Sequence, residues 1–337
     1  MKHNDLPKEY YTTQLKQLPL YIKWADLIVK EMPKFFPLKK LERVDCQGCG
    51  KTHCLPAFTK NGFSYEQCSA CGSLFVSPRP TETMLNSFYR NSRAMKFWKQ
   101  EIMQSTLTIR KTYQISPLTN WLQSIISKYF GNTEIQAIDY KPCITTVWDT
   151  EKIKTNPIHL TLAEPILFQT LRPIYGKGSV RIANDFARIS RKANLITAFG
   201  VLEQSYNPRK MIREISKKCR PGGLLLMTTN TMSGFEYQIL GPHSHRIVPP
   251  YRLNLLTIEA IQNLLTESGF KTINCSTPGK LDAAIVANTA AYNPEIILPN
   301  FFNYLFTRRD SKILKSFQDF LQLSNLSSHL RIAARKI

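Results

Sequence analysis

The sequence predicts an α/β fold built on an open, mainly parallel sheet, with a small metal-binding module ahead of it. Three observations carry this prediction. One is a strand–helix–strand pattern between residues 194 and 230, and another is a repeated Cys-x-x-Cys-Gly motif between residues 46 and 72. The third is the alternation of short apolar runs with helical stretches from residue 134 onward. Such alternation is typical of parallel strands joined by right-handed helical crossovers.

The stretch 194–230 shows the pattern most clearly. Leu195–Val201 is a short apolar run without helical period, as expected of a strand buried on both faces. Asn207-Pro208 then suits the start of an amphipathic helix, because asparagine caps helix N-termini and proline fits the first turn. Leu224–Thr229 reads as a second buried strand. A ligand is therefore expected at the carboxyl edge of this sheet, near Gly200 to Gln204.

Composition and charge limit the classes of protein to consider. A chain of 337 residues with 43% hydrophobic content can bury one large core plus small accessory modules. No apolar run approaches the roughly 20 residues that span a bilayer, and no signal peptide is recognisable, so we expect a cytoplasmic protein. The formal charge of +21 favours an anionic partner, namely nucleic acid, an anionic substrate or an acidic membrane surface. The basic residues are spread along the chain, which equally suits a solvated surface.

The cysteine motif is the most specific feature of the sequence. Two CxxCG units are separated by seventeen residues, and each places two thiolates on one tight turn. Two such turns complete a tetrahedral site of four sulfurs, which zinc fits best. With four protein ligands the site is closed, so the predicted zinc is structural rather than catalytic. The predicted ligands are Cys46, Cys49, Cys68 and Cys71.

The remaining elements follow in order along the chain. Candidate strands lie at 135–139, 159–164 and 179–184, and a helix at 257–268 ends at Gly269. Two further strands, Thr272–Ser276 and Ala283–Ala287, form a predicted terminal hairpin, and the chain beyond Pro299 turns helical and stops in a basic tail. We predict five segments: a helical segment 1–44, the zinc ribbon 45–80, a helical connector 81–130, the α/β domain 131–290 and a C-terminal helical extension 291–337.

Several segments together resemble class I S-adenosylmethionine-dependent methyltransferases, and most closely a bacterial group with an N-terminal zinc ribbon and a C-terminal LSSH segment. The resemblance covers residues 41–337. It implies a Rossmann-like sheet of seven strands, the last antiparallel, with the cofactor across the carboxyl ends of the first, second and fourth. The segments that carry it are the two CxxCG units, FVSPRP (Phe75–Pro80), AFGVLEQ to NP (Ala198–Pro208), RPGGLLLMTTN (Arg220–Asn230), PPYRLNLLT (Pro249–Thr257), ESGF (Glu267–Phe270), TPGKLD (Thr277–Asp282) and FLQLSNLSSHLRIAARK (Phe320–Lys336).

The resemblance also implies tasks for single residues. Glu164, at the end of the second strand, would accept hydrogen bonds from the two ribose hydroxyls. Asp185 would face the adenine amino group, with the ring of Phe186 packing nearby. The loop that starts at Phe199 and Gly200 would line the sulfonium and the methyl group. The alternative for Glu164 and Asp185 is an ordinary capping or surface carboxylate, which is common at strand ends.

The sequence departs from the family pattern in the loop after the first strand. The family carries an acid followed by spaced glycines, which let the backbone approach the amino-acid part of the cofactor. Here the loop reads Asp139-Tyr140-Lys141-Pro142-Cys143, so the acid is kept and both glycines are replaced. The predicted cofactor contacts in this loop are Asp139, Tyr140 and Lys141. Lys141 would place a cation near the sulfonium, which is unfavourable unless a carboxylate lies between them. The helix expected next, Thr145–Thr155, has a poor amphipathic pattern.

Two further positions differ from the group. Its Leu-Glu-His reads Leu202-Glu203-Gln204 here, and its Pro-Pro-x-His-Leu-Asn carries Arg252 in place of the histidine. Glutamine cannot take up a proton and arginine stays protonated, so neither replaces a histidine as general base. Gln204, Tyr251 and Arg252 are the predicted acceptor-binding and catalytic positions.

Three hypotheses follow. The first is a methyltransferase acting on a small-molecule or glycan-type acceptor, which Arg252 and the basic surface would suit if it is anionic. The second is a lapsed member that keeps the fold as a binding or regulatory module, without S-adenosylmethionine. The third is a nucleic-acid binder, which we rank last because the sequence has no stacking motif such as an RRM signature.

Overall fold

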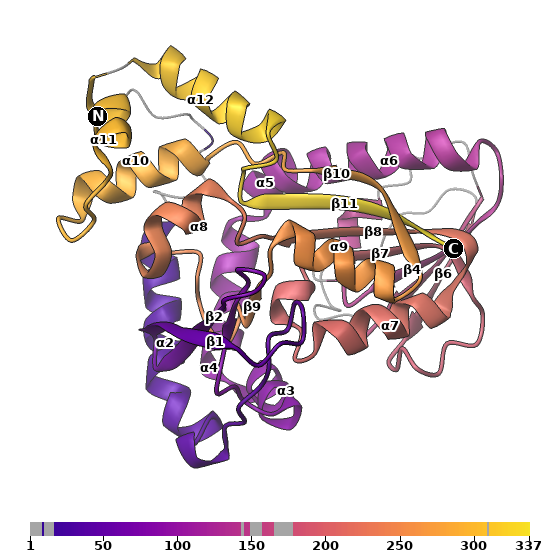
Figure 1. Ribbon diagram of the computed structural model, residues 1–337. Helices are drawn as coiled ribbons and strands as arrows, with labels where there is room; N and C mark the ends of the chain where they lie inside the picture. Colours follow the sequence, from indigo (N-terminus) through magenta and orange to yellow (C-terminus); the bar gives the residue numbers. More distant parts are fainter. Residues whose placement is uncertain (1–8, 10–16, 143–144, 149–156, 165–177, 309) are drawn as a thin grey trace.

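Two sheets organise the chain in the computed structural model, which describes residues 9, 17–142, 145–148, 157–164, 178–308 and 310–337. A seven-stranded sheet forms the centre of one half of the molecule, and a four-stranded sheet lies in the other half (Figure 1). The larger sheet has the order β10-β11-β8-β7-β4-β5-β6, and the smaller one has the order β1-β2-β3-β9.

The larger sheet confirms the predicted fold class. Its first five strands pair in parallel, while β11 lies antiparallel between β8 and β10. The sheet is therefore seven-stranded and mixed, with the strand that comes last along the chain antiparallel. Its strands are β4 (Ile135–Tyr140), β5 (Ile158–Ala163), β6 (Gly178–Ala183), β7 (Ala193–Phe199), β8 (Cys219–Asn230), β10 (Phe270–Ser276) and β11 (His329–Lys336).

The prediction of a strand at Ala283–Ala287 is wrong. These residues lie in helix α10 (Asp282–Tyr292), where each of the five is buried. A short run that is apolar on every side does not distinguish a buried helix from a buried strand. The missing strand is β11, which the sequence analysis treated as a basic tail of the helical extension 291–337.

Helices cover both faces of the larger sheet (Figure 1). On one face α6 (Ser116–Phe130) packs against β4, β5 and β8. On the other face α7 (Pro208–Lys218) and α9 (Ile258–Glu267) enclose a second apolar core. The predicted start of α7 is confirmed, since the side chain of Asn207 accepts a 2.8 Å hydrogen bond from the backbone N–H of Lys210.

The smaller sheet contains the cysteine motif. Its strands are β1 (Cys54–Lys60), β2 (Phe63–Cys68), β3 (Leu74–Val76) and the two-residue β9 (Asn254–Leu255). β9 belongs to a segment far along the chain and pairs antiparallel with β3. The ribbon is thus joined by a strand to the half of the molecule that holds the larger sheet.

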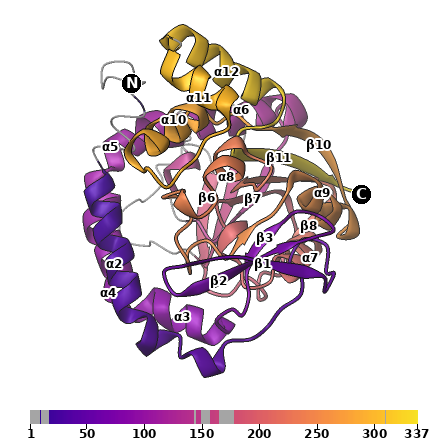
Figure 2. The same cartoon turned by 60° about the vertical axis from the view of Figure 1, so that its left-hand side comes forward.

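The helices around the ribbon pack beside it, as Figure 2 shows. α2 runs without interruption through Pro33. Of the helix expected at 145–155, Thr145–Trp148 forms a 3-10 turn and the rest lies outside the described residues. The elements of this part are α2 (Leu18–Phe35), a 3-10 turn (Leu38–Lys40), α3 (Glu82–Asn91), α4 (Arg93–Phe97), a π-helical segment (Trp98–Met103), α5 (Leu107–Arg110) and a second π-helical segment (Lys111–Ile115).

The remaining helices form a small apolar cluster with α10 at one end of the molecule. They are α8 (Phe235–Leu240), α11 (Asn300–Arg308) and α12 (Ser311–Leu323), with 3-10 turns at Leu202–Gln204 and Gly241–His243. Within the described part of the chain, none of the helices has the length and apolar character that a bilayer crossing requires.

Candidate active site at the carboxyl edge of the sheet

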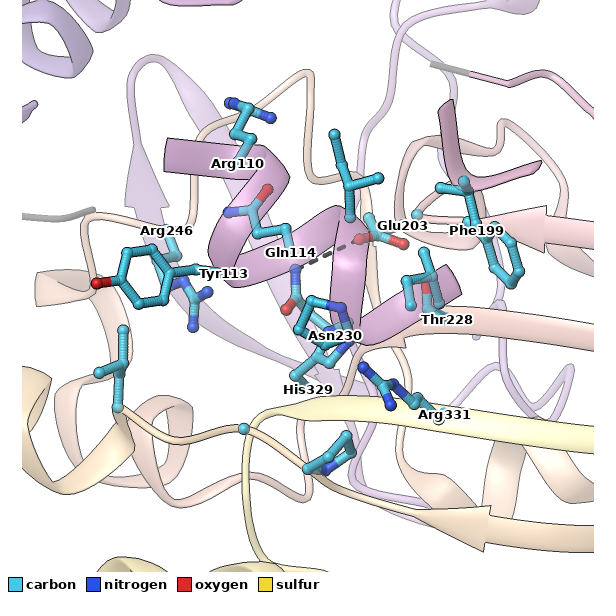
Figure 3. A pocket seen from close by; sticks show the side chains of 18 of the residues that line it. Arg110, Tyr113, Gln114, Phe199, Glu203, Thr228, Asn230, Arg246, His329 and Arg331 are labelled. Atoms are coloured by element: carbon cyan, nitrogen blue, oxygen red, sulfur yellow. Dashed lines mark hydrogen bonds between the residues drawn. The ribbon is translucent and has the colours of Figure 1, made fainter. Parts of the chain in front are cut away.

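A cavity of about 530 Å³ opens at the carboxyl ends of β4, β7 and β8. Parallel strands of an open α/β sheet present their ligand sites at this edge, because the loops that follow the strands meet there. The other walls come from the π-helical segments, from the loops around residues 246–252 and 278–282, and from the start of β11 (Figure 3). The volume suits a small molecule.

Asp139 lies at the end of β4 and lines the cavity. Its side chain is buried, and its Oδ1 accepts a 2.7 Å hydrogen bond from the hydroxyl of Thr197 on the neighbouring β7. Burial raises the pKa of Asp139 to about 7, because a carboxylate loses its hydration there. Asp139 therefore exchanges a proton near neutral pH.

A polar network fills the wall after β7. The buried carboxylate of Glu203 accepts a 2.8 Å hydrogen bond from Thr229 and lies 3.7 Å from Nη1 of Arg252. The side chain of Asn230 lies 3.3 Å from Glu203 and from the Arg252 guanidinium. Glu203 thereby fixes the position of Arg252. Glu203 was not among the site residues predicted from the sequence, although it directly precedes Gln204.

The predicted acceptor-binding residues are gathered on the cavity wall. Gln204, Tyr251 and Arg252 line it, as do Phe199 and Gly200. The amide of Gln204 donates a 3.1 Å hydrogen bond to the carbonyl of Gly200. The ring of Tyr251 packs edge-on against Trp24 and stacks against the Arg252 guanidinium at 5.1 Å.

The other predicted cofactor residues form a cluster at the ends of β4, β5 and β6. Nζ of Lys141, which stands in place of a family glycine, lies 3.4 Å from Oε2 of Glu164, so the two side chains form an ion pair. The second oxygen of Glu164 accepts a 2.9 Å hydrogen bond from the backbone N–H of Phe186. The rings of Tyr140 and Phe186 meet edge-to-face at 4.7 Å. Both Glu164 oxygens are thus engaged within the chain.

Asp185 is placed differently. Its Oδ1 accepts a hydrogen bond from the backbone N–H of Ala187, and its Oδ2 lies 3.2 Å from Nε of Arg188. These contacts are those of an ordinary turn carboxylate. The structure therefore gives Asp185 a local capping contact within the loop after β6.

The cavity has a cationic wall that the sequence analysis missed. His329 and Arg331 enter it from β11, and Arg246 enters it from the loop after α8 (Figure 3). Burial and the positive charges of Arg331 and Arg246 lower the pKa of His329 to about 3, so the imidazole is neutral at physiological pH. The signal in the sequence was the alternation of His329, Arg331, Ala333 and Arg335 with apolar residues, which is the period of a strand.

The four predicted metal ligands come together in the ribbon. All their sulfurs lie within 4.8 Å of one another, and the pairs Cys46–Cys71 and Cys49–Cys68 lie at 3.5 Å. A tetrahedral zinc site with Zn–S bonds of about 2.3 Å places its sulfurs about 3.8 Å apart. The cluster therefore fits a four-coordinate metal ion, and it lies outside the cavity.

The strand order and the ligand edge define a Rossmann-like methyltransferase fold, and a comparison with protein families gives the family. Residues 47–274 match the family described as methyltransferase domain, which is more than half of the 337 residues. The chain belongs to this family. No curated protein sequence matches the chain.

Solved structures with a similar fold include methyltransferases. One is an S-adenosylmethionine-dependent methyltransferase from Mesorhizobium loti, with 12% identity and a TM-score of 0.39 over 66% of this chain and 100% of that one. Another is the plantazolicin methyltransferase BamL in complex with a triazolic desmethylPZN analogue and SAH, with 14% identity and a TM-score of 0.42 over 75% and 94%.

Proposed function

We propose that this chain is an S-adenosylmethionine-dependent methyltransferase that acts on a small-molecule or glycan-type, anionic acceptor. The observation that carries the proposal is the cavity at the carboxyl edge, which Asp139 and Gly200 line from the strand ends and Arg252 from the opposite loop. Methyl transfer needs two ligands held in line, with the protein mainly positioning them. The cavity lies between the strand ends and the loop that carries Arg252, and the cluster around Glu164 adjoins the same edge of the sheet without lining the cavity.

The residues at the strand ends fit the cofactor. Glu164 directly follows β5, the second strand, where the family resemblance implies a carboxylate that accepts hydrogen bonds from the ribose hydroxyls. Gly200 has a φ of +66°, and a Cβ there would meet no atom within 4 Å, which leaves room for the amino-acid part of the cofactor. When bound, S-adenosylmethionine would supply the methyl group on a sulfonium.

Lys141 competes with the cofactor for Glu164, but this competition does not prevent the cofactor from binding. About a third of each of the two side chains is exposed, and an ion pair of this kind contributes only about 0–1 kcal/mol. Displacing it would weaken cofactor binding by a factor of about five at most. The ion pair alone therefore does not remove the proposed activity.

Methylation of a hydroxyl group needs a proton acceptor, and the cavity wall carries more than one carboxylate, of which Glu203 is already engaged by Thr229 and Arg252. Gln204 and Arg252 cannot take up the proton. Asp139 lines the same cavity and is buried next to the Thr197 hydroxyl, with a pKa of about 7. We therefore assign the general-base role to Asp139 for an acceptor that must be deprotonated.

One observation favours the alternative, a methyltransferase fold kept as a binding module. Both Glu164 oxygens have partners within the chain, and one of these partners is the backbone of Phe186, whose ring packs against Tyr140. If these contacts are permanent, the cofactor cannot bind. The cavity would then hold another ligand.

Calorimetric titration with S-adenosylmethionine and with its demethylated product tests the proposal. We expect saturable binding, weakened at least tenfold in Glu164→Gln. Glu134→Gln is the matched control, because Glu134 directly precedes β4, at the opposite, amino edge of the sheet. Absence of heat at millimolar ligand would overturn the proposal and favour the binding module.

A further inference from the structure

The cationic wall of the cavity is built on β11. His329 and Arg331 project from the same face of this strand, which packs against α6, while Leu330 and Ile332 project into the opposite core. Figure 3 shows His329 and Arg331 along β11 among the side chains that line the cavity. Arg331 thus enters the cavity from an interior strand of the sheet, which holds its Cα rigidly.

Two of the three arginines on this wall form ion pairs with carboxylates, while the positive charge of Arg331 has no such partner in the described residues. The guanidinium of Arg246 lies 3.1 Å from Glu236, and that of Arg252 lies 3.7 Å from Glu203. Arg331 has no carboxylate partner in the described part of the chain, and its buried Nε has no hydrogen-bond acceptor there. Its guanidinium makes a cation–π contact with the ring of Trp121, with Cζ 5.5 Å from the ring centre.

A partly buried guanidinium without an acceptor is costly unless a ligand completes its hydrogen bonds. The groups that surround it point to the ligand's chemistry. The neutral ring of His329 can donate one hydrogen bond, and the hydroxyl of Thr228, directly opposite Arg331 on β8, can donate another. The carboxylates that line the same cavity, Asp139, Glu203 and Asp282, have hydrogen-bond partners of their own, and in the described chain none of them pairs with Arg331.

We propose that Arg331, with His329 and Thr228, binds an oxyanion of the ligand, either a carboxylate or a phosphate. The planar guanidinium matches both groups with two parallel N–H···O bonds, and the aromatic ring behind it fixes its plane. The inference rests on the proposed function only in calling that ligand the methyl acceptor. It makes Arg331 the residue that determines specificity for an anionic group.

Anion titrations at constant ionic strength test this site. The probes are inorganic phosphate and acetate, with chloride as the balancing salt, and the readout is tryptophan fluorescence, because Trp121 lies against Arg331. We expect a saturable change with at least one probe, and its absence in Trp121→Phe. A response to phosphate alone or to acetate alone identifies which oxyanion the site prefers.

Variants of two arginines on the same face of β11 show whether binding of the anion probe depends on Arg331 in particular. Arg331→Leu should weaken binding of the probe at least tenfold, while Arg331→Lys, which keeps the charge and loses the planar fork, should weaken it about threefold to tenfold. Arg335→Leu is the matched control, since Arg335 stacks on Tyr129 in the same way but does not line the cavity. Equal binding in wild type and Arg331→Leu, or equal losses in Arg331→Leu and Arg335→Leu, would overturn the site.

A parallel titration with the demethylated cofactor separates this inference from the proposed function. Anion binding that depends on Arg331, in a protein that does not bind the cofactor, supports the oxyanion site and rejects the methyltransferase activity. Cofactor binding without any response to the anions supports the proposed methyltransferase function and rejects the oxyanion site. Should Arg331→Leu fail to fold, the comparison of Arg331→Lys with wild type decides, because the lysine variant keeps the buried charge.

Discussion

At the scale of single residues, the buried carboxyl group of Asp139 makes stability depend on pH. Its pKa is about 7 in the folded chain, against about 4 when unfolded. The folded chain therefore holds a proton that the unfolded chain has lost, and stability falls as the pH rises from about 4 to about 7. Full ionisation costs on the order of 4 kcal/mol at most, since one pKa unit corresponds to about 1.4 kcal/mol.

Asp139→Asn should remove this dependence. The amide oxygen can still accept the hydrogen bond from Thr197. We expect equal stability of variant and wild type near pH 4, and a more stable variant above pH 7, by up to about 4 kcal/mol. Urea unfolding across this range measures the difference. A constant difference at all pH values would show that Asp139 does not titrate in the folded chain.

Lys141 carries a second residue-scale prediction. Lys141→Ala frees one oxygen of Glu164 for a ribose hydroxyl and removes a cation near the expected sulfonium. We expect cofactor affinity to rise about threefold to fivefold, measured by calorimetry. Lys271→Ala, an exposed lysine on β10, is the control. An unchanged or lower affinity would contradict the inferred competition for Glu164.

The candidate site was predictable in part from residue patterns. The loops after β4 and β7 follow buried strands, so Asp139 and Gly200 could be placed at the ligand edge. Glu203 and Arg331 could not be assigned. The role of Glu203 depends on Arg252, about fifty residues further on, and that of Arg331 on the position of β11 in the sheet.

At the scale of secondary-structure elements, Asp282 joins α10 to the chain just before β11. Its buried carboxylate accepts hydrogen bonds from the backbone N–H of Ser328 at 2.7 Å, from the hydroxyl of Ser327 and from Gln318 at 3.3 Å. These contacts hold the serines of the LSSH segment. The segment therefore positions His329 at the cavity.

Asp282→Ala should destabilise the protein by about 3 kcal/mol, because buried donors lose their acceptor. Asp310→Ala is the control. Asp310 caps α12 with two backbone hydrogen bonds but is exposed, so we expect a cost of about 1 kcal/mol. Chemical denaturation measures both. Equal costs would show that the Asp282 contacts contribute no more than an exposed cap.

Elements with local signals were predicted well. The capped helix α7 between two apolar strands needs no distant information. α10 and β11 were misassigned because tertiary contacts determine their patterns. Burial of all of Ala283–Ala287 hides the helical period. Arg331 and Arg335 in β11 stack on aromatic rings of α6, so its inward face looks like a basic, solvated stretch.

At the scale of the whole molecule, the cysteine cluster is tied to the cavity. The hydroxyl of Thr257 donates a hydrogen bond to the carbonyl of Cys71, and the backbone N–H of Val76 donates to the carbonyl of Leu253. The buried Arg79 donates to the side chain of Asn254 at 3.1 Å. The loop that carries Arg252 is thus fixed from the ribbon side.

Metal removal should therefore loosen the cavity wall. We expect one zinc per chain, and after chelation at least tenfold faster hydrogen exchange at Leu253, whose N–H donates to the carbonyl of Glu203. The amide of Ile196, in the central strand β7, serves as the internal control and should keep its rate. Unchanged exchange at Leu253 in the metal-free protein would show that ribbon and cavity are independent.

The position of β11 has a consequence for how the chain is made. Both of its neighbours, β8 and β10, are synthesised earlier. Neither can pair with β11 until residues 329–336 have left the ribosome. Until then one edge of β8 is open and β10 is unpaired, and open strand edges are templates for wrong pairing. Yield in the cell should consequently depend on how well the unfinished polypeptide is shielded by chaperones during translation.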